Sequence, residues 1–134
     1  MVNSPAVSAP ENLRNPPDVW AYEIEGWTVW AGKTARDNDR LSIKVARGND
    51  WWFHLKGMPS SHVVLFVRDR NEPPKHIIEQ AAAICAWHSK QRQGGTVSVS
   101  CTRAKHVTKP RGAKAGTVQI KKESVLKVRP QLPQ

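Results

Sequence analysis

Apolar and polar residues alternate in several short stretches of the chain, and this pattern predicts strands with one buried face. In "RLSIKVA", residues 40–46, Leu41, Ile43 and Val45 point to one side and Ser42 and Lys44 to the other. "TVSVSC", residues 96–101, alternates in the same way, and "KGMPSS" after "WWFHL" has the chemistry of a hairpin turn. We therefore expect strands at 27–32, 40–46, 51–55, 62–67, 96–101, 117–121 and 125–128.

The segment from 75 to 92 has the periodicity of a helix instead. It follows Pro73 and Pro74, and Gly94 and Gly95 end it. One helical face would carry Ile77, Ala81, Ile84, Cys85 and His88. The pattern predicts an α+β fold, with a mostly antiparallel sheet of five to seven strands and one or two helices packed on it.

The two ends of the chain have a different composition. The first 19 residues contain four prolines and no periodicity. We expect a segment without regular structure over 1–20, one folded domain over 21–130 and a short tail over 131–134. With no signal peptide pattern and no apolar run near the ~20 residues of a membrane span, we expect a cytoplasmic protein without membrane contact. Cys85 and Cys101 lack the spacing of a disulfide framework and are expected to be buried thiols.

Positive charge is concentrated at the C-terminal end. The net charge is +10 over 134 residues. Residues 101–134 contain nine Lys or Arg and one Glu, whereas residues 1–20 contain one Arg, one Asp and one Glu. Such a field attracts polyanions, because neutralising each phosphate releases condensed counterions. The charge favours nucleic acid or the ribosome as the partner; phosphate contacts do not distinguish RNA from DNA, so DNA stays an alternative.

A glycine-containing basic loop, "HVTKPRGAKAGTVQI" at 106–120, is the strongest candidate for phosphate contact. Gly112 and Gly116 permit backbone conformations in which free amides join the cations around a phosphate. It lacks the GxxxxGK[ST] pattern of nucleotide-hydrolysing P-loops. Asn38 and Asp39, in an expected loop at 32–41, would tie down neighbouring amides. The candidate phosphate-binding cations are Lys33, Arg36, Arg40, Lys105, Lys109, Arg111 and Lys114.

A second candidate site lies in "GNDWWFHLKGMPSSHVV", residues 48–64. Asp50, His54 and His62 could meet at one end of two neighbouring strands as an acid/base unit, with Ser60 or Ser61 as a hydrolase nucleophile. Alternatively, these groups only fix strand ends, or the histidines contact unpaired bases. A metal site that combined them with Cys101 and His106 matches no standard zinc spacing.

Adjacent tryptophans at the start of this segment raise a further choice. In a strand, Trp51 and Trp52 face opposite sides of the sheet. If one side is uncovered, Trp51 offers an indole on which an RNA base stacks. If helices cover both sides, both rings belong to the core.

Taken in order, three of these stretches resemble one known family. They are "GKTARDNDRLSIKVARGNDWWFHLKGMPSSHVVL", a helix rich in Ala and "CTRAKHVTKPRGAKAGTVQI". Together they are similar to the NFACT-R domain, the RNA-binding-type module of proteins that act in ribosome-associated quality control. The resemblance runs from about Trp27 to Pro130. Where the family usually has Asn and Gly, this chain has Thr34 and Ser60, and the other parts of NFACT proteins have no room in 134 residues.

The resemblance implies a stand-alone RNA-binding module that engages tRNA, rRNA or the ribosome. We assign it no catalytic residue, cofactor or metal. Two alternatives stay open: an RNA-processing or RNA-modification accessory enzyme that uses Asp50, His54 and His62, and an adaptor that contacts a protein through the helix at 75–92. The sequence leaves the oligomeric state undetermined.

Overall fold

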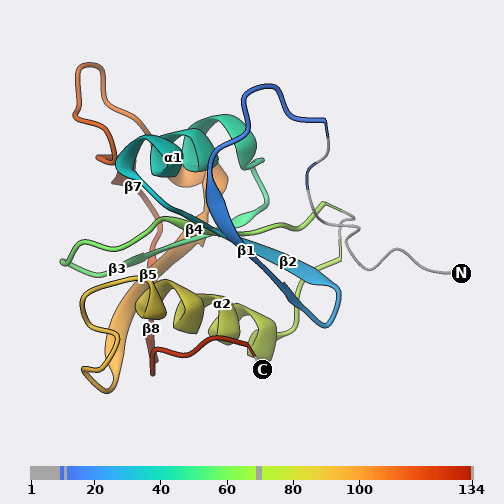
Figure 1. The fold of residues 1–134 in the computed structure, drawn as a ribbon, viewed down its shortest axis with the longest axis vertical. Coiled ribbons are helices and arrows are strands. Elements are labelled where there is room, and N and C mark those ends of the chain that lie inside the picture. Colours follow the sequence, from blue (N-terminus) through green and yellow to red (C-terminus); the bar gives the residue numbers. More distant parts are fainter. Residues whose placement is uncertain (1–9, 11, 69–70, 134) are drawn as a thin grey trace, which may run out of the picture.

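The protein is described by a computed structural model that covers residues 10, 12–68 and 71–133 (Figure 1). Half of the segment expected to lack regular structure, residues 1–9 and 11, lies outside the described residues. The described part contains β1 (Val19–Ile24), β2 (Trp27–Gly32), α1 (Ala35–Asp39), the π-helix η1 (Arg40–Val45), β3 (Trp51–Leu55), β4 (Val63–Leu65), α2 (Lys75–Trp87), β5 (Val97–Arg103), the 3₁₀ turn η2 (Ala104–His106), β6 (Val107–Thr108), β7 (Gln119–Ile120) and β8 (Ser124–Val128).

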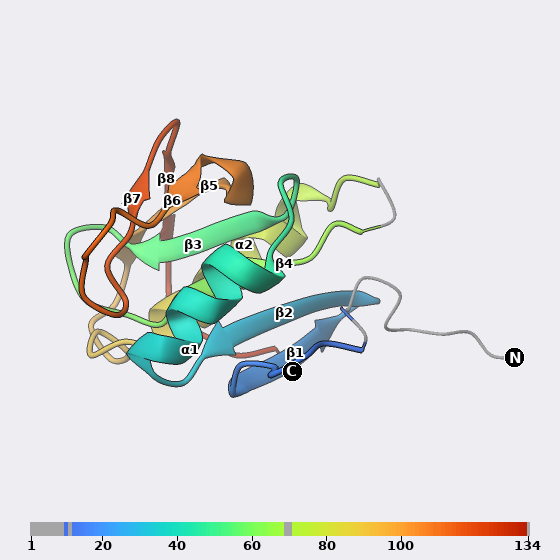
Figure 2. The same ribbon diagram turned by 90° about the horizontal axis from the view of Figure 1, so that it is seen from above.

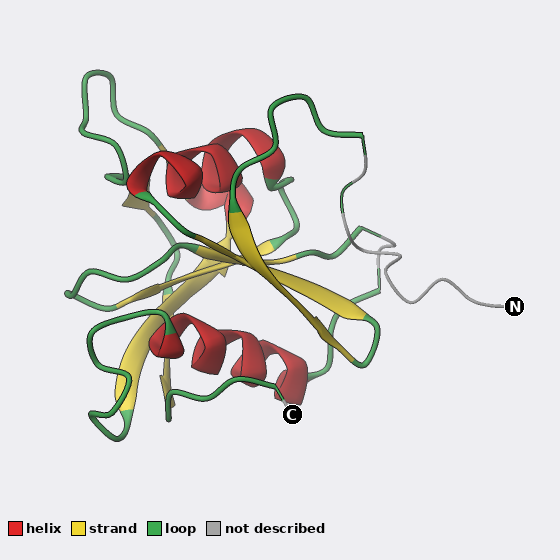
Figure 3. Ribbon diagram, in the orientation of Figure 1, coloured by secondary structure: helices red, strands yellow, loops and turns green. Residues whose placement is uncertain are grey.

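Six of the strands form one antiparallel sheet in the order β1-β2-β4-β3-β5-β8. The short strands β6 and β7 pair separately. Figures 2 and 3 show α1 and α2 on opposite faces of this sheet. The predicted α+β class, strand number and antiparallel arrangement are therefore confirmed.

Each face of the sheet has its own hydrophobic core. Phe53 and Leu55 of β3 point to the α2 face and pack among Ile77, Ile84 and other buried residues. Trp52, between them, points to the other face and packs with the buried residues Leu41, Val45, Val64, Phe66 and Val107. Helices cover both faces, and a hollow lined by Trp52, His54 and Ser100 reaches the α1 face of the sheet beside residues 116–118.

The strand predicted at 40–46 and the loop predicted at 32–41 are wrong: residues 35–45 form one continuous helix, α1 followed by η1. Thr34 starts it through a capping box, since its hydroxyl accepts from the Asp37 amide and the Asp37 carboxylate accepts from the Thr34 amide. Leu41 and Val45, four residues apart, are its buried apolar positions. The alternation of Leu41, Ile43 and Val45 fits a strand equally well over so short a window, and burial against Trp52 favours the helix.

The other predicted elements differ from the structure mainly at their ends. Helix α2 ends at Trp87 rather than near residue 92. Strand β1 begins at Val19, inside the segment expected to lack regular structure. The strands expected at 117–121 and 125–128 belong to different sheets, because Lys122 turns the chain with a positive φ of 56°.

Two further sequence expectations concern the thiols and the membrane. Cys85 and Cys101 are free and buried, as predicted, and burial raises the pKa of each to about 12, so both stay protonated. Among the residues that the structure describes, no helix has the length and apolar character needed to cross a bilayer.

Candidate nucleic-acid interface

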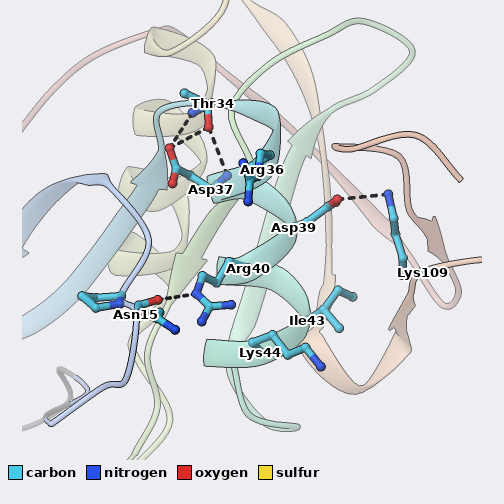
Figure 4. A pocket seen from close by; sticks show the side chains of 10 residues that line it. Asn15, Thr34, Arg36, Asp37, Asp39, Arg40, Ile43, Lys44 and Lys109 are labelled. Carbon is cyan, nitrogen blue, oxygen red and sulfur yellow. Dashed lines mark hydrogen bonds and ion pairs between the residues drawn. The ribbon is translucent and has the colours of Figure 1, made fainter.

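Three basic residues follow one side of the α1–η1 helix at intervals of four. Arg36, Arg40 and Lys44 line one hollow of about 710 Å³ (Figure 4). The spacing of four residues places successive cations about 6 Å apart along a helix. Within the described chain, none of the three forms an ion pair with a carboxylate. We call this surface the α1 basic face.

Two aspartates of the hollow are already engaged by neighbouring groups. Asp37 accepts hydrogen bonds from the amides of Thr34 and Asp18, and these bonds lower the pKa of its carboxyl. Asp39 forms an ion pair of 3.1 Å with Lys109. The Arg40 guanidinium donates to the backbone oxygen of Asn15, a neutral partner that leaves its charge uncompensated. The hollow therefore keeps a positive balance.

The basic loop at 109–118 is fixed to this helix by its own first lysine. Besides the ion pair with Asp39, the Lys109 ammonium donates to the carbonyls of Lys114 and Thr117. All three of its protons have acceptors, so Lys109 organises the loop and has no proton left for a phosphate. The side chains of Arg111 and Lys114 stay exposed near the tip of the loop, which projects beside the start of α1 in Figure 1.

Gly116 closes the loop against the helix. Its amide donates to Asp39 Oδ1 at 3.0 Å, and its φ is +86°. A Cβ at this position would lie 3.2 Å from the Cβ of Ala35. Both the backbone conformation and the close approach therefore require glycine. Gly112, with a φ of +78°, lies at the exposed tip, so the two glycines of the motif have different roles.

Behind the loop, a chain of buried hydrogen bonds determines the proton positions on His62. His62 Nε2 carries a proton and donates it to the Gly116 carbonyl at 3.1 Å, because a carbonyl can only accept. In the neutral ring Nδ1 then accepts the Ser42 hydroxyl proton at 2.8 Å, while Ser42 Oγ accepts from Trp52 Nε1, also at 2.8 Å. Burial, aided by the nearby His54, lowers the pKa of His62 to about 4. His62 is therefore a neutral structural link between sheet, helix and loop.

His54 lies beside this link, at the wall of a second hollow of about 310 Å³. Its ring stacks on Trp52 with 5.9 Å between centroids, and its Nδ1 donates to the Leu55 carbonyl at 2.6 Å. Burial lowers its pKa. The hollow also contains the ion pair between Lys56 and Glu123, with 3.6 Å between nitrogen and oxygen.

Asp50 does not join the two histidines, contrary to the predicted Asp50–His54–His62 unit. It lies before the first residue of β3, whereas His54 lies near the end of that strand. Its buried carboxylate accepts from the amides of Arg47 and Val67 and pairs with the Arg68 guanidinium at 3.0 Å. Asp50 therefore holds the opposite end of the β3–β4 hairpin together.

Two other candidates lie at that same far end. The ring of Trp51 is half-buried against the α2 core and covered by the Arg103 guanidinium, 3.8 Å from the ring centroid. The amide of Lys105 donates to the Gly48 carbonyl, and its side chain is exposed there. Neither Trp51 nor Lys105 lines the hollow of the α1 basic face. Lys33 lies just before α1, where it pairs with Asp18 at 3.4 Å.

Asn38 lies in a helix and binds the amide of a distant residue, rather than a neighbouring amide in a loop. Its Oδ1 accepts the His62 amide at 3.0 Å, which fixes the start of β4 against α1. Within the described ranges, no three His, Cys, Asp or Glu side chains gather in a way that could hold a metal ion. His54 and Cys101 lie on opposite faces of the sheet, since Cys101 belongs to the α2 core.

We expect the protein to lose stability as the pH falls from about 6.5 to about 4. The pKa of His62 is about 4 in the fold and 6.5 ordinarily, so in this range the unfolded chain binds the proton and the folded chain does not. The contribution of His62 is complete above about pH 6.5, and its loss amounts to about 3 kcal/mol. Urea unfolding at several pH values measures the effect. In His62→Gln the free energy of unfolding should fall less steeply between pH 6.5 and 4 than in the wild type. In His76→Gln, which changes an exposed histidine, it should fall as in the wild type. The same pH dependence in the wild type and both variants would contradict the assignment.

Comparison with known proteins identifies the family of this chain. Residues 19–122 match the NFACT protein RNA binding domain. The chain belongs to this family. It is 38% identical over 115 residues to the Rqc2 homolog RqcH of Bacillus subtilis, covering 85% of this chain and 20% of that protein. The RqcH of Streptococcus suis is 36% identical over 102 residues, which cover 76% of this chain and 18% of that protein.

A solved structure supports the same assignment of the NFACT RNA-binding domain. The C-terminal part of the fibronectin/fibrinogen-binding protein of Streptococcus suis superposes with a TM-score of 0.78 at 31% identity. The match covers 93% of this chain and 49% of that one. Because the chain spans about a fifth of the curated relatives, the likeness concerns this one domain.

Sequence reasoning missed Lys44 as a member of the NFACT domain's basic face. In the predicted strand, the Lys44 side chain alternates with the apolar side chains, and nothing places it on the same surface as Arg36 and Arg40. Two signals could have found it: the four-residue spacing of the three cations, and the Thr34-x-x-Asp37 capping signature before them.

Proposed function

We propose that this NFACT domain binds RNA of the translation machinery, tRNA or rRNA, and serves ribosome-associated quality control in the cytoplasm. The contact surface is the α1 basic face together with Arg111 and Lys114 of the loop. The single observation that carries the proposal is this surface, on which Arg36, Arg40 and Lys44 have no carboxylate partner in the described chain.

The family and the relatives named RqcH support an RNA partner, and the electrostatics supports the location. A phosphate chain meets cations fixed to a capped helix and to a loop held by Lys109 and Gly116. Because those two residues fix the loop before binding, less conformational entropy is lost when the RNA arrives.

The alternative of an RNA-processing enzyme has less support from the geometry. Asp50 is engaged with Arg68 at the far end of β3. His62 Nδ1 accepts the Ser42 hydroxyl proton, and His62 Nε2 donates its own proton to the Gly116 carbonyl. A general base would need a free nitrogen near a substrate, and His62 offers none.

The proposal is tested by the salt dependence of RNA binding. With about five phosphate contacts, the slope of log K against log salt should be about −3.5 to −4.5. Fluorescence anisotropy with tRNA and with rRNA fragments, at several salt concentrations, measures it, and DNA of matched length tests the choice of sugar. Co-sedimentation with ribosomal subunits addresses the ribosome directly. A flat salt response with every RNA would overturn the proposal.

A further inference from the structure

A third hollow, of about 390 Å³, opens around the exposed ring of Trp20 at the start of β1. Trp20 keeps 39% of its surface exposed, more than any other Trp, Tyr or Phe among the described residues. Its neighbours in the hollow include Lys33, Lys90 and Arg92 and the hydroxyl residues Thr34, Ser60 and Ser61. The lining residues thus combine an aromatic ring, cations and hydroxyl donors without a carboxylate.

The Trp20 ring is held in a fixed position by the end of α2. It stacks on His88 with 4.3 Å between centroids and 15° between planes. The Tyr22 hydroxyl shares a hydrogen bond of 2.6 Å with His88 Nε2, which orients the imidazole. Burial lowers the pKa of His88 to about 4, so the stack is neutral at physiological pH. A rigid, neutral and exposed ring is what a nucleobase requires for stacking.

Cations line the hollow around this ring. The Lys33 ammonium lies over the Trp20 ring, 5.6 Å from its centroid, and its partner Asp18 has a side chain that is 73% exposed, so water screens the pair. The Arg92 guanidinium lies over Trp87, 4.4 Å from the ring centroid, and Lys90 is exposed. These side chains are able to reorient toward a phosphate that arrives with its base.

The Trp20 hollow adjoins the α1 basic face. Thr34, the first residue of the helix cap, lines both hollows. A strand that follows Lys44, Arg40 and Arg36 toward the start of the helix therefore arrives at Lys33 and Trp20. Among the described rings, Trp20 is thus the exposed platform that the sequence suggested at Trp51.

We propose that the Trp20 hollow binds one unpaired nucleotide of RNA, with the base stacked on Trp20 and the phosphate held by Lys33 and Lys90. The inference rests on the proposed RNA-binding function and adds to it a preference for unpaired over paired segments. A base inside a duplex has both faces stacked on its neighbours and is unable to use the indole.

The test compares a short oligouridylate with a blunt RNA duplex by fluorescence anisotropy. Trp20→Ala should weaken oligouridylate binding about five- to a hundredfold and leave duplex binding unchanged. Trp20→Phe, which retains an aromatic face, should keep most of the affinity. Met58→Ala is the matched control, because Met58 is equally exposed, at 39%, but lies in the β3–β4 turn.

A second measurement does not depend on a variant that folds. Thiouridine in the oligouridylate, irradiated in complex with the wild-type protein, should crosslink to Trp20, as mapped by mass spectrometry. Crosslinks that map only elsewhere, or equal oligouridylate affinity for folded Trp20→Ala and wild type, would overturn the inference and leave the proposed function intact. Absence of binding to either RNA would overturn both.

Discussion

Replacing Arg36, Arg40 and Lys44 by glutamine is expected to weaken RNA binding about a hundredfold to several hundredfold at 0.1 M salt. Each lost phosphate contact removes about 0.7 to 0.9 from the slope of log K against log salt, so three together lower its magnitude by about 2 to 3. The three side chains lie at the surface and pair with no carboxylate in the described chain, so the variant should keep its fold. Anisotropy titrations across a salt series measure both quantities.

The matched control removes the same charge from the opposite edge of the sheet. Lys122→Gln, Lys127→Gln and Arg129→Gln change exposed cations on or beside β8, which is separated from β1 by the whole width of the sheet. This variant should lose much less affinity, since its cations act only through the general field. Equal losses in the two variants would show that net charge alone, and no particular face, governs binding.

Replacing Asp50 by alanine is expected to lower the free energy of unfolding by about 3 to 5 kcal/mol. The Asp50 carboxylate is 1% exposed and accepts from two amides and the Arg68 guanidinium. Its removal leaves a half-buried cation and two amides without their acceptor. A domain typically has only about 5 to 15 kcal/mol of stability, so much of the variant would unfold in mild denaturant. Urea unfolding measures the change.

An exposed ion pair provides the comparison for Asp50. Glu72 pairs with Arg103 at 2.8 Å, but its side chain is 56% exposed, so Glu72→Ala should cost about 0 to 1 kcal/mol. Asp50→Asn should retain RNA affinity under conditions where it is folded. If folded Asp50→Asn lost RNA binding with little change in stability, Asp50 would have a direct role in RNA binding.

The sheet could be read largely from the sequence, because its strands alternate with period two or form short dense apolar runs. Val97, Val99 and Cys101 share the α2 core as their spacing predicts. The segment 40–46 was mistaken because alternation over so few residues also fits one face of a helix. The capping pair Thr34 and Asp37 was the better guide there, since a cap has a defined spacing and a strand entry does not.

The candidate site was predictable in its composition and less so in its geometry. The Lys109 side chain points to Asp39 rather than to the solvent. This contact joins distant parts of the chain, and no local sequence pattern indicates it. The sequence was sufficient to predict that Asp50 lies apart from the histidines. In an antiparallel hairpin, His54 and His62 flank the turn at 56–61, and Asp50 must lie at the open end.

Covering both faces of the sheet by helices has a consequence for selectivity. Domains that spread nucleotides over an open sheet read the edges of successive bases, and this architecture gives up that option. The cations of the α1 basic face and the Trp20 indole, which lie at the periphery, do not themselves distinguish one base from another. For the RNA binding proposed above, the selection of a target would then depend more on the shape of the RNA than on its base sequence.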